Sequence, residues 1–192
     1  MQTRKCCFIG HRQIKITEDL VSKIESYIEN LILEKKVKIF LFGSRSEFNF
    51  LCYQIVSKLM ERFKNIKRIF YGCKSESVFL ERDREKWIKI INNDKILNKI
   101  MFVEGECEFK NKYKAGKASY IERDYSMIDD SDYCLFYYNP NYKPNKRKPF
   151  KNSPYFYQPK SGTSLSYAYA LKQNKICINF FDNTLFDLVK TK

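Results

Sequence analysis

The pattern that most restricts the fold is a repeated alternation between short apolar segments and longer amphipathic ones. Strands that read as continuous apolar runs belong to parallel sheets covered by helices on both faces. The alternation therefore predicts an α/β protein, with a Rossmann-like, doubly wound, mostly parallel sheet of about five strands and helices on both faces. The strands are expected at residues 5–10, 38–43, 67–72, 132–139 and 175–181.

The segments between these strands have helical periodicity. Apolar residues fall on one face of residues 17–36, and Thr17 suits the N-cap position of that helix. The same spacing predicts helices at residues 48–63, 119–131 and 161–174. These four helices and the five strands together account for half of the chain.

The chain of 192 residues suits a single domain, residues 1–192, with a substantial core. It contains no internal repeat and no low-complexity tract. Residues 73–112 fit the alternation least well: Trp87 lies in a helix-like stretch, and residues 99–105 suit either a strand or a loop.

The charge is strongly positive, with 36 Lys and Arg residues against 22 Asp and Glu, a formal net charge of +14. This excess indicates an anionic partner such as a nucleotide, a nucleic acid or an acidic membrane surface, although scattered surface lysines account for it equally well. No run of about 18 apolar residues exists, and the N-terminal apolar run has only four residues. We therefore expect no membrane partner and a cytoplasmic location.

Seven cysteines occur without any CxxC spacing, and several of them lie inside apolar runs. An odd count in this pattern favours small buried side chains in a reducing compartment over disulfides or zinc ligands. Since the chain has one histidine, we expect no metal site. The acidic cluster Asp129, Asp130 and Asp132 is expected to serve in capping and turns before a strand.

One segment interrupts the alternation. All five prolines of the chain fall within residues 139–160, together with six basic residues, several aromatic residues and no acidic one. Because this segment connects the end of a strand to the start of a helix, it belongs to the edge of the sheet where α/β proteins bind ligands. Its candidate ligand contacts are Lys146, Arg147, Lys148, Tyr157 and Lys160.

Three glycines occupy predicted strand-to-helix junctions, and each is followed by polar or cationic residues. Glycine allows a sharp turn and a close approach to a ligand, and the following helix N-terminus attracts anions. One such junction is explained by geometry alone, but three at one edge beside a basic loop predict an anion site. The candidate ligand-binding residues are Gly10, His11, Arg12, Gly43, Ser44, Arg45, Phe48, Ser161, Gly162, Thr163 and Ser164.

Individual members of this set have different expected roles. Arg12 and Arg45 are suited to phosphate, because a guanidinium matches two phosphate oxygens. Phe48 and Tyr157 are candidates for stacking on a base. A single histidine such as His11 is more often a hydrogen-bonded structural residue than a catalyst.

Four blocks of the sequence together resemble a bacterial, mostly Firmicutes, group within the SLOG superfamily. The blocks are CCFIGHR, FGSRSEFNFLCYQIVSKL, YIERDYSMIDDSDYCLFYYN and YQPKSGTSLSYAYALKQNKICINFF, and they cover most of the chain in order. This superfamily of Rossmann-like domains also includes the LONELY GUY phosphoribohydrolases and the DNA-processing protein A fold. The resemblance implies a domain that binds nucleotides or nucleotide-derived ligands at its glycine junctions.

Residue by residue, Gly10-His11-Arg12 matches the first-strand motif of the superfamily, and Ser161-Gly162-Thr163 matches its phosphate-side motif. The LONELY GUY enzymes carry PGGxGTxxE, in which the glutamate serves catalysis. In the same register this chain has Ser166 where that glutamate would stand. The departure argues against phosphoribohydrolase activity.

Three functions remain open at this stage. The first is a sensor or sequestering protein that binds a small anionic, nucleotide-like ligand, uses no further cofactor and forms a homo-oligomer. The second is a nucleotide-processing enzyme, a glycosidic-bond hydrolase or deoxyribosyltransferase-like protein, for which Glu47, Glu122 and Asp124 are the candidate carboxylates. The third is a nucleic-acid-binding protein, which accounts for the charge but not for the three junctions.

Overall fold

The computed structural model describes residues 3–43, 46–72, 106–109, 117–143, 161–182 and 184–186. Within these residues one seven-stranded sheet has the order β4-β3-β2-β1-β5-β6-β7. Neighbouring strands are parallel except β6 and β7, which are antiparallel. The strands are β1 (Arg4–Gly10), β2 (Val37–Phe42), β3 (Lys67–Gly72), β4 (Glu106–Phe109), β5 (Tyr133–Tyr137), β6 (Ile176–Asn179) and β7 (Thr184–Phe186).

The predicted fold class is confirmed: this is a Rossmann-like α/β protein with a mostly parallel sheet. The five predicted strands correspond to β1, β2, β3, β5 and β6. The additional strands are the two edges of the sheet, β4 and β7, which have four and three residues and are too short for a clear period. The predicted helix near Trp87 and the predicted strand or loop at residues 99–105 lie outside the described residues.

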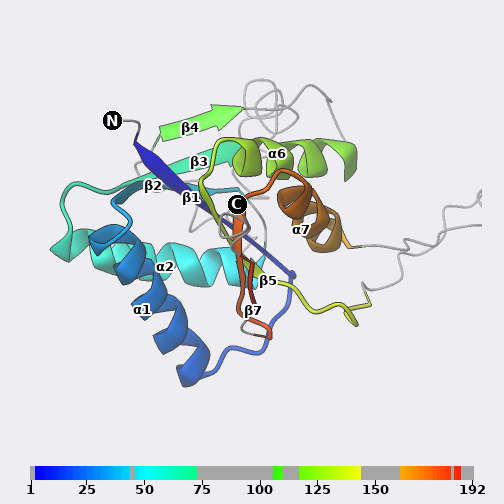
Figure 1. Cartoon of the computed structure of the whole chain (residues 1–192), viewed down its shortest axis with the longest axis horizontal. Helices are drawn as coiled ribbons and strands as arrows, with labels where there is room; N and C mark the ends of the chain where they lie inside the picture. The colour runs from blue at the N-terminus through cyan, green and yellow to red at the C-terminus, as the bar shows by residue number, and fades with distance from the viewer. Residues whose placement is uncertain are drawn as a thin grey trace, which may run out of the picture.

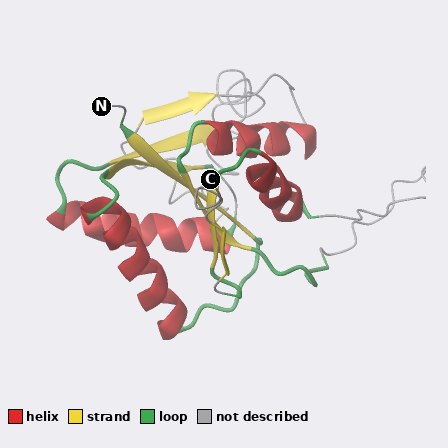
Figure 2. Ribbon diagram, in the orientation of Figure 1, coloured by secondary structure: helices red, strands yellow, loops and turns green. Residues whose placement is uncertain are grey.

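The helices cover the two faces of the sheet in pairs. Figures 1 and 2 show α1 (Glu18–Leu33) and α2 (Glu47–Arg62) on one side, with α6 (Lys117–Asp129) and α7 (Gly162–Lys172) on the other. Thr17 caps α1 as predicted, because its side chain accepts a hydrogen bond from the backbone N–H of Leu20. None of the described helices is long and apolar enough to cross a membrane.

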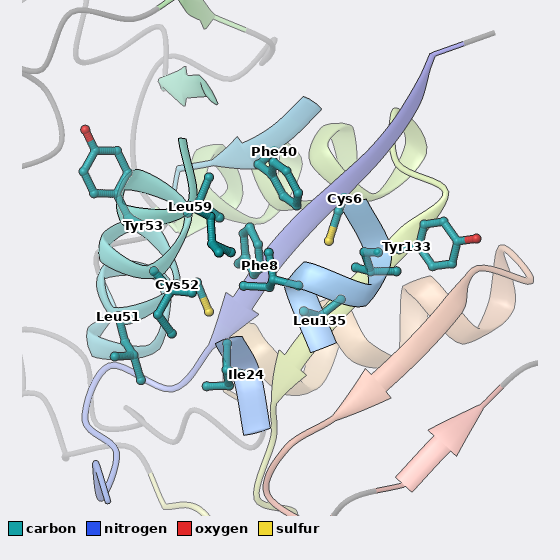
Figure 3. Packing of buried hydrophobic residues seen from close by; sticks show 14 of the residues in the cluster. Cys6, Phe8, Ile24, Phe40, Leu51, Cys52, Tyr53, Leu59, Tyr133 and Leu135 are labelled. Atoms are coloured by element: carbon teal, nitrogen blue, oxygen red, sulfur yellow. The ribbon is translucent and has the colours of Figure 1, made fainter. Parts of the chain in front are cut away.

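The core divides into two hydrophobic clusters because side chains alternate across each strand. On β1, Cys6 and Phe8 point toward α1 and α2, whereas Cys7 and Ile9 point toward α6 and α7. Figure 3 shows side chains of α2 packed against β1 in the first cluster. The five cysteines that the structure describes in full are buried and free, as expected for small core residues: Cys6, Cys7, Cys52, Cys134 and Cys177.

The order of the strands identifies one edge of the sheet as the place for a ligand. From β1 the chain passes through α1 to β2 on one side, and from β5 it passes through α7 to β6 on the other. Because β1 and β5 are neighbours, the strand order reverses between them. Ligands of open α/β sheets bind at the carboxyl ends of the strands at such a point.

Candidate functional site

The carboxyl end of β1 is packed tightly against the start of α2. A Cβ placed on Gly10 would lie only 2.5 Å from the Cβ of Phe48, so no other residue fits here without moving α2. Phe48 is fully buried and its ring lies near that of Tyr137. Phe48 therefore belongs to the hydrophobic core and offers no exposed face to a base, contrary to the sequence-based hypothesis.

His11 directly follows β1 and is held by the loop after β5. The backbone N–H of Asn139 lies 2.9 Å from Nε2, and the carbonyl oxygen of the same residue lies 3.2 Å away. The shorter contact assigns Nε2 as an acceptor, so the neutral ring carries its proton on Nδ1. Burial lowers the pKa of His11, although the hydrogen bond with the Asn139 backbone acts in the opposite direction. The lowered pKa favours the neutral form of the ring.

The Nδ1 atom of His11 is buried and has no hydrogen-bond partner among the described residues. The whole side chain is only 2% exposed. Buried donors without an acceptor are rare in folded proteins and call for a specific explanation. Nε2 makes the structural hydrogen bond expected for a lone histidine, whereas Nδ1 makes none among the described residues.

Two backbone contacts fix the carboxyl end of β5. The side chain of Asn179 accepts a hydrogen bond from Tyr138 N–H and donates one to Tyr138 C=O, each at 2.8 Å. The hydroxyl of Tyr138 lies 3.5 Å from Oγ of Ser164 in the first turn of α7. Tyr138 therefore connects the end of β5 to the start of α7.

The start of α7 has the features of an anion site. Ser161 is the N-cap, and its Oγ accepts a hydrogen bond from Ser164 N–H at 3.0 Å. A Cβ placed on Gly162 would meet no described atom within 4 Å beyond its own helix and chain neighbours, so the described residues leave the space beside it open. The N–H groups at the start of a helix have no partner within that helix, and they carry partial positive charge.

A buried ion pair lies between α6 and α7. The Arg123 Nη2 atom is 2.9 Å from Oδ1 of Asp124, and the two residues are 3% and 7% exposed. Oγ of Ser166, which is fully buried on α7, donates to Oδ2 of Asp124 at 3.4 Å. Burial raises the pKa of Asp124, while Arg123 and Ser166 act in the opposite direction.

The second glycine junction, like the first, is closed by packing. A Cβ on Gly43 would lie 2.7 Å from the carbonyl oxygen of Tyr71 and 3.0 Å from Cδ of Arg123. Gly43 is thus required for the fit of α6 against the ends of β2 and β3. Its neighbours Ser44 and Arg45 lie outside the described residues.

The other candidate carboxylates and cations are distributed around this edge. Glu47 accepts a hydrogen bond from Ile14 N–H at 2.8 Å, and its own N–H donates to the carbonyl of Arg12, so it holds the loop after β1. The side chain of Arg12 is exposed. Glu122 is half-buried on α6, next to the ion pair. The loop candidates Lys146, Arg147, Lys148, Tyr157 and Lys160 lie outside the described residues.

The acidic residues before β5 contact neighbouring elements of the fold, whereas a role in capping and turns was expected from the sequence. Asp132 accepts a hydrogen bond from Lys5 N–H at 2.8 Å, and Asp129 accepts one from the Tyr169 hydroxyl at 2.9 Å. No group of His, Cys, Asp or Glu side chains in the described part of the chain is arranged to hold a metal ion.

The structure brings together four predicted positions, His11, Ser161, Gly162 and Ser164, through residues that sequence reasoning passed over. Tyr138 and Asn139 make the connections between them, since they contact Ser164 and His11 respectively. In the sequence these two stand at the carboxyl end of the strand expected at residues 132–139, and the structure places them just after β5. No protein-family model matches this chain, and a search of curated proteins found no match either.

Proposed function

We propose that the protein binds a nucleotide or nucleotide-derived anion at the carboxyl edge of the sheet, between β1, β5 and α7. The observation that carries this proposal is the start of α7, where Ser161 caps the helix and the space beside Gly162 is open. A phosphate in that space would accept hydrogen bonds from the first N–H groups of an 11-residue helix. The reversal of strand order at the same edge supports this placement.

Two further features support an anionic ligand of this class. The net charge of +14 raises the local concentration of anions, and the exposed Arg12 lies on the loop that follows β1. The Nδ1–H of His11, which has no partner among the described residues, is a buried donor at the same edge. The resemblance of the chain to the SLOG superfamily is in keeping with a nucleotide.

The arrangement favours holding the ligand over cleaving it. Ser166, in the register of the LONELY GUY glutamate, has a hydroxyl that donates to Asp124 and is fully buried. The carboxylate of Glu47 already accepts a hydrogen bond from a backbone N–H of the loop after β1. We therefore propose a sensor or sequestering protein.

The test is calorimetric titration of the protein with ADP, GDP, CDP and UDP. A Gly162→Ala variant should bind as the parent does, because a methyl group fits the open space. A Gly162→Val variant should bind at least about tenfold more weakly, because its branched side chain occupies the space proposed for phosphate. Equal affinities in the two variants, or no binding by the parent, would refute the proposal.

A nucleotide-cleaving enzyme is the second candidate, and the buried carboxyl of Asp124 is the observation that favours it. Burial raises the pKa of this carboxyl group, as catalytic acids require. The carboxyl group accepts a hydrogen bond from the Ser166 hydroxyl on α7. Chromatography after incubation with the same four nucleotides detects any released base. Release that disappears in Asp124→Asn but persists in Glu47→Gln would establish this activity, and intact nucleotides would exclude it.

A further inference from the structure

An aromatic stack closes the loop that follows β5. The ring of Tyr142 lies parallel to that of His11, with centroids 3.9 Å apart and an interplanar angle of 15°. His11 is buried at 2% exposure, whereas Tyr142 is half-buried. Among the described residues, no other ring contacts Tyr142, so His11 covers one face of the tyrosine and leaves the other uncovered by aromatic groups.

Asn139 holds both rings of this stack in place. Its backbone N–H donates to Nε2 of His11 at 2.9 Å, and its carbonyl accepts from Tyr142 N–H at 3.1 Å. Its side-chain oxygen accepts from Asn141 N–H at 2.8 Å, which fixes the turn between them. A surface that is ordered before binding loses little conformational entropy when a ligand docks on it.

The stack lies in the same site as the start of α7. The ring of Tyr138 is tilted against His11 with centroids 6.0 Å apart, and the hydroxyl of Tyr138 lies 3.5 Å from Oγ of Ser164. Tyr142 and the first turn of α7 are therefore joined through two side chains. A nucleotide carries its base and its phosphate at opposite ends of a ribose, which suits a ligand that contacts two separate places in one site.

On the basis of the proposed function, we propose that Tyr142 is the base-binding residue of this site. An aromatic base stacks on the face of Tyr142 that His11 does not cover, while the phosphate lies at Gly162. The ligand class is thus a nucleotide in which the base contributes to affinity, in contrast to a sugar phosphate or an inorganic anion. Stacking alone gives affinity for a base without strict selection among bases.

Titration of the full chain with ADP, GDP, CDP, UDP, ribose 5-phosphate and pyrophosphate tests this subsite. At least one nucleotide should bind the parent roughly tenfold or more tightly than ribose 5-phosphate does. Tyr142→Ala should remove that advantage and leave the affinity for ribose 5-phosphate unchanged. Tyr142→Phe should keep the advantage, because it retains the ring.

Tyr125 provides a matched control. It is a half-buried tyrosine of α6 in a comparable stack, with its ring centroid 3.8 Å from that of Tyr169 on α7 and an interplanar angle of 9°. Tyr125→Ala should leave the preference for nucleotides intact, and thermal unfolding of each variant checks that it is folded.

The outcomes separate this inference from the proposed function. If the parent binds nucleotides and ribose 5-phosphate equally, the base subsite is refuted while the anion site stands. If Tyr142→Ala and Tyr142→Phe lose the advantage alike, the tyrosine does not act through its ring and the subsite is again refuted. If no probe binds, both proposals fall.

Discussion

Gly10 and Gly162 both stand at a strand-to-helix junction, yet their surroundings are opposite. A Cβ on Gly10 would lie 2.5 Å from Phe48, whereas a Cβ on Gly162 would meet nothing within 4 Å among the described residues beyond its own helix. Gly43 belongs with Gly10, since Tyr71 and Arg123 close the space beside it. Two glycines are thus required by packing, and one borders open space.

A glycine at a junction therefore indicates a ligand only where the structure leaves room for one. At Gly10 and Gly43 the missing side chain lets helices approach the ends of the strands. At Gly162, in the first turn of a capped helix, the described residues leave the space beside the glycine unfilled instead. We therefore expect side chains added at Gly10 and Gly43, the closed junctions, to lower the free energy of unfolding. A bulky side chain added at Gly162, the open junction, should instead lower ligand affinity.

The largest effect is expected at Arg123, which lies beside the closed junction at Gly43 and pairs with Asp124. Its Cδ would lie 3.0 Å from a Cβ on Gly43, and its guanidinium holds Asp124, the partner of Ser166 on α7. Arg123→Met leaves a buried carboxylate without its counter-charge, which should lower the free energy of unfolding by about 3–5 kcal/mol at neutral pH. Urea unfolding followed by circular dichroism measures this loss.

The double variant Arg123→Met/Asp124→Asn is the control for this prediction. Because an amide carries no charge, it should be more stable than Arg123→Met alone. The pH dependence has a defined sign: burial raises the pKa of Asp124, so the folded state holds that proton more strongly than the unfolded state. Stability therefore falls as pH rises from the ordinary carboxyl range through the raised pKa, and Asp124→Asn alone should reduce that fall.

The next largest effect is expected at the closed junction after β1. Gly10→Ala forces a methyl group against Phe48 in a packed core and should cost about 1–3 kcal/mol of the free energy of unfolding. The same unfolding measurement applies. A loss below about 0.5 kcal/mol would show that α2 shifts easily and that the junction is not closed by packing.

The smallest effect is expected at the open junction. Gly162→Ala meets no steric obstacle, and it lowers the entropy of the unfolded chain, so it should stabilise the protein by about 0.4–1 kcal/mol. A destabilisation as large as that of Gly10→Ala would contradict the distinction between the two junctions.

The fold could be predicted from the sequence because its determinants are local. Apolar runs and helical periods mark β1, β2, β3, β5 and β6 as well as α1, α2, α6 and α7, and the cap at Thr17 is a short-range signal. The strand β7 was not predicted, since its three residues have no period and depend on pairing with β6.

The candidate site was predictable only in part, because its contacts are between residues distant in the chain. Gly162 and Ser161 could be identified from a strand, a loop and a helix in succession. The stack of His11 on Tyr142 joins residues more than 100 positions apart, and nothing local indicates it. Phe48 has the sequence spacing of a core residue. Only the structure shows that the absence of a side chain at Gly10 leaves room for it.

Binding of a nucleotide at the start of α7 can be tested directly, because the chain has only six glycines. Protein labelled with ¹⁵N only at glycine should give at most six backbone amide signals, and the signal missing in Gly162→Ala identifies Gly162. Titration with ADP, GDP, CDP and UDP should shift the Gly162 signal more than those of Gly10 and Gly43 for at least one nucleotide. A Gly162 signal that stays in place for all four would contradict the account.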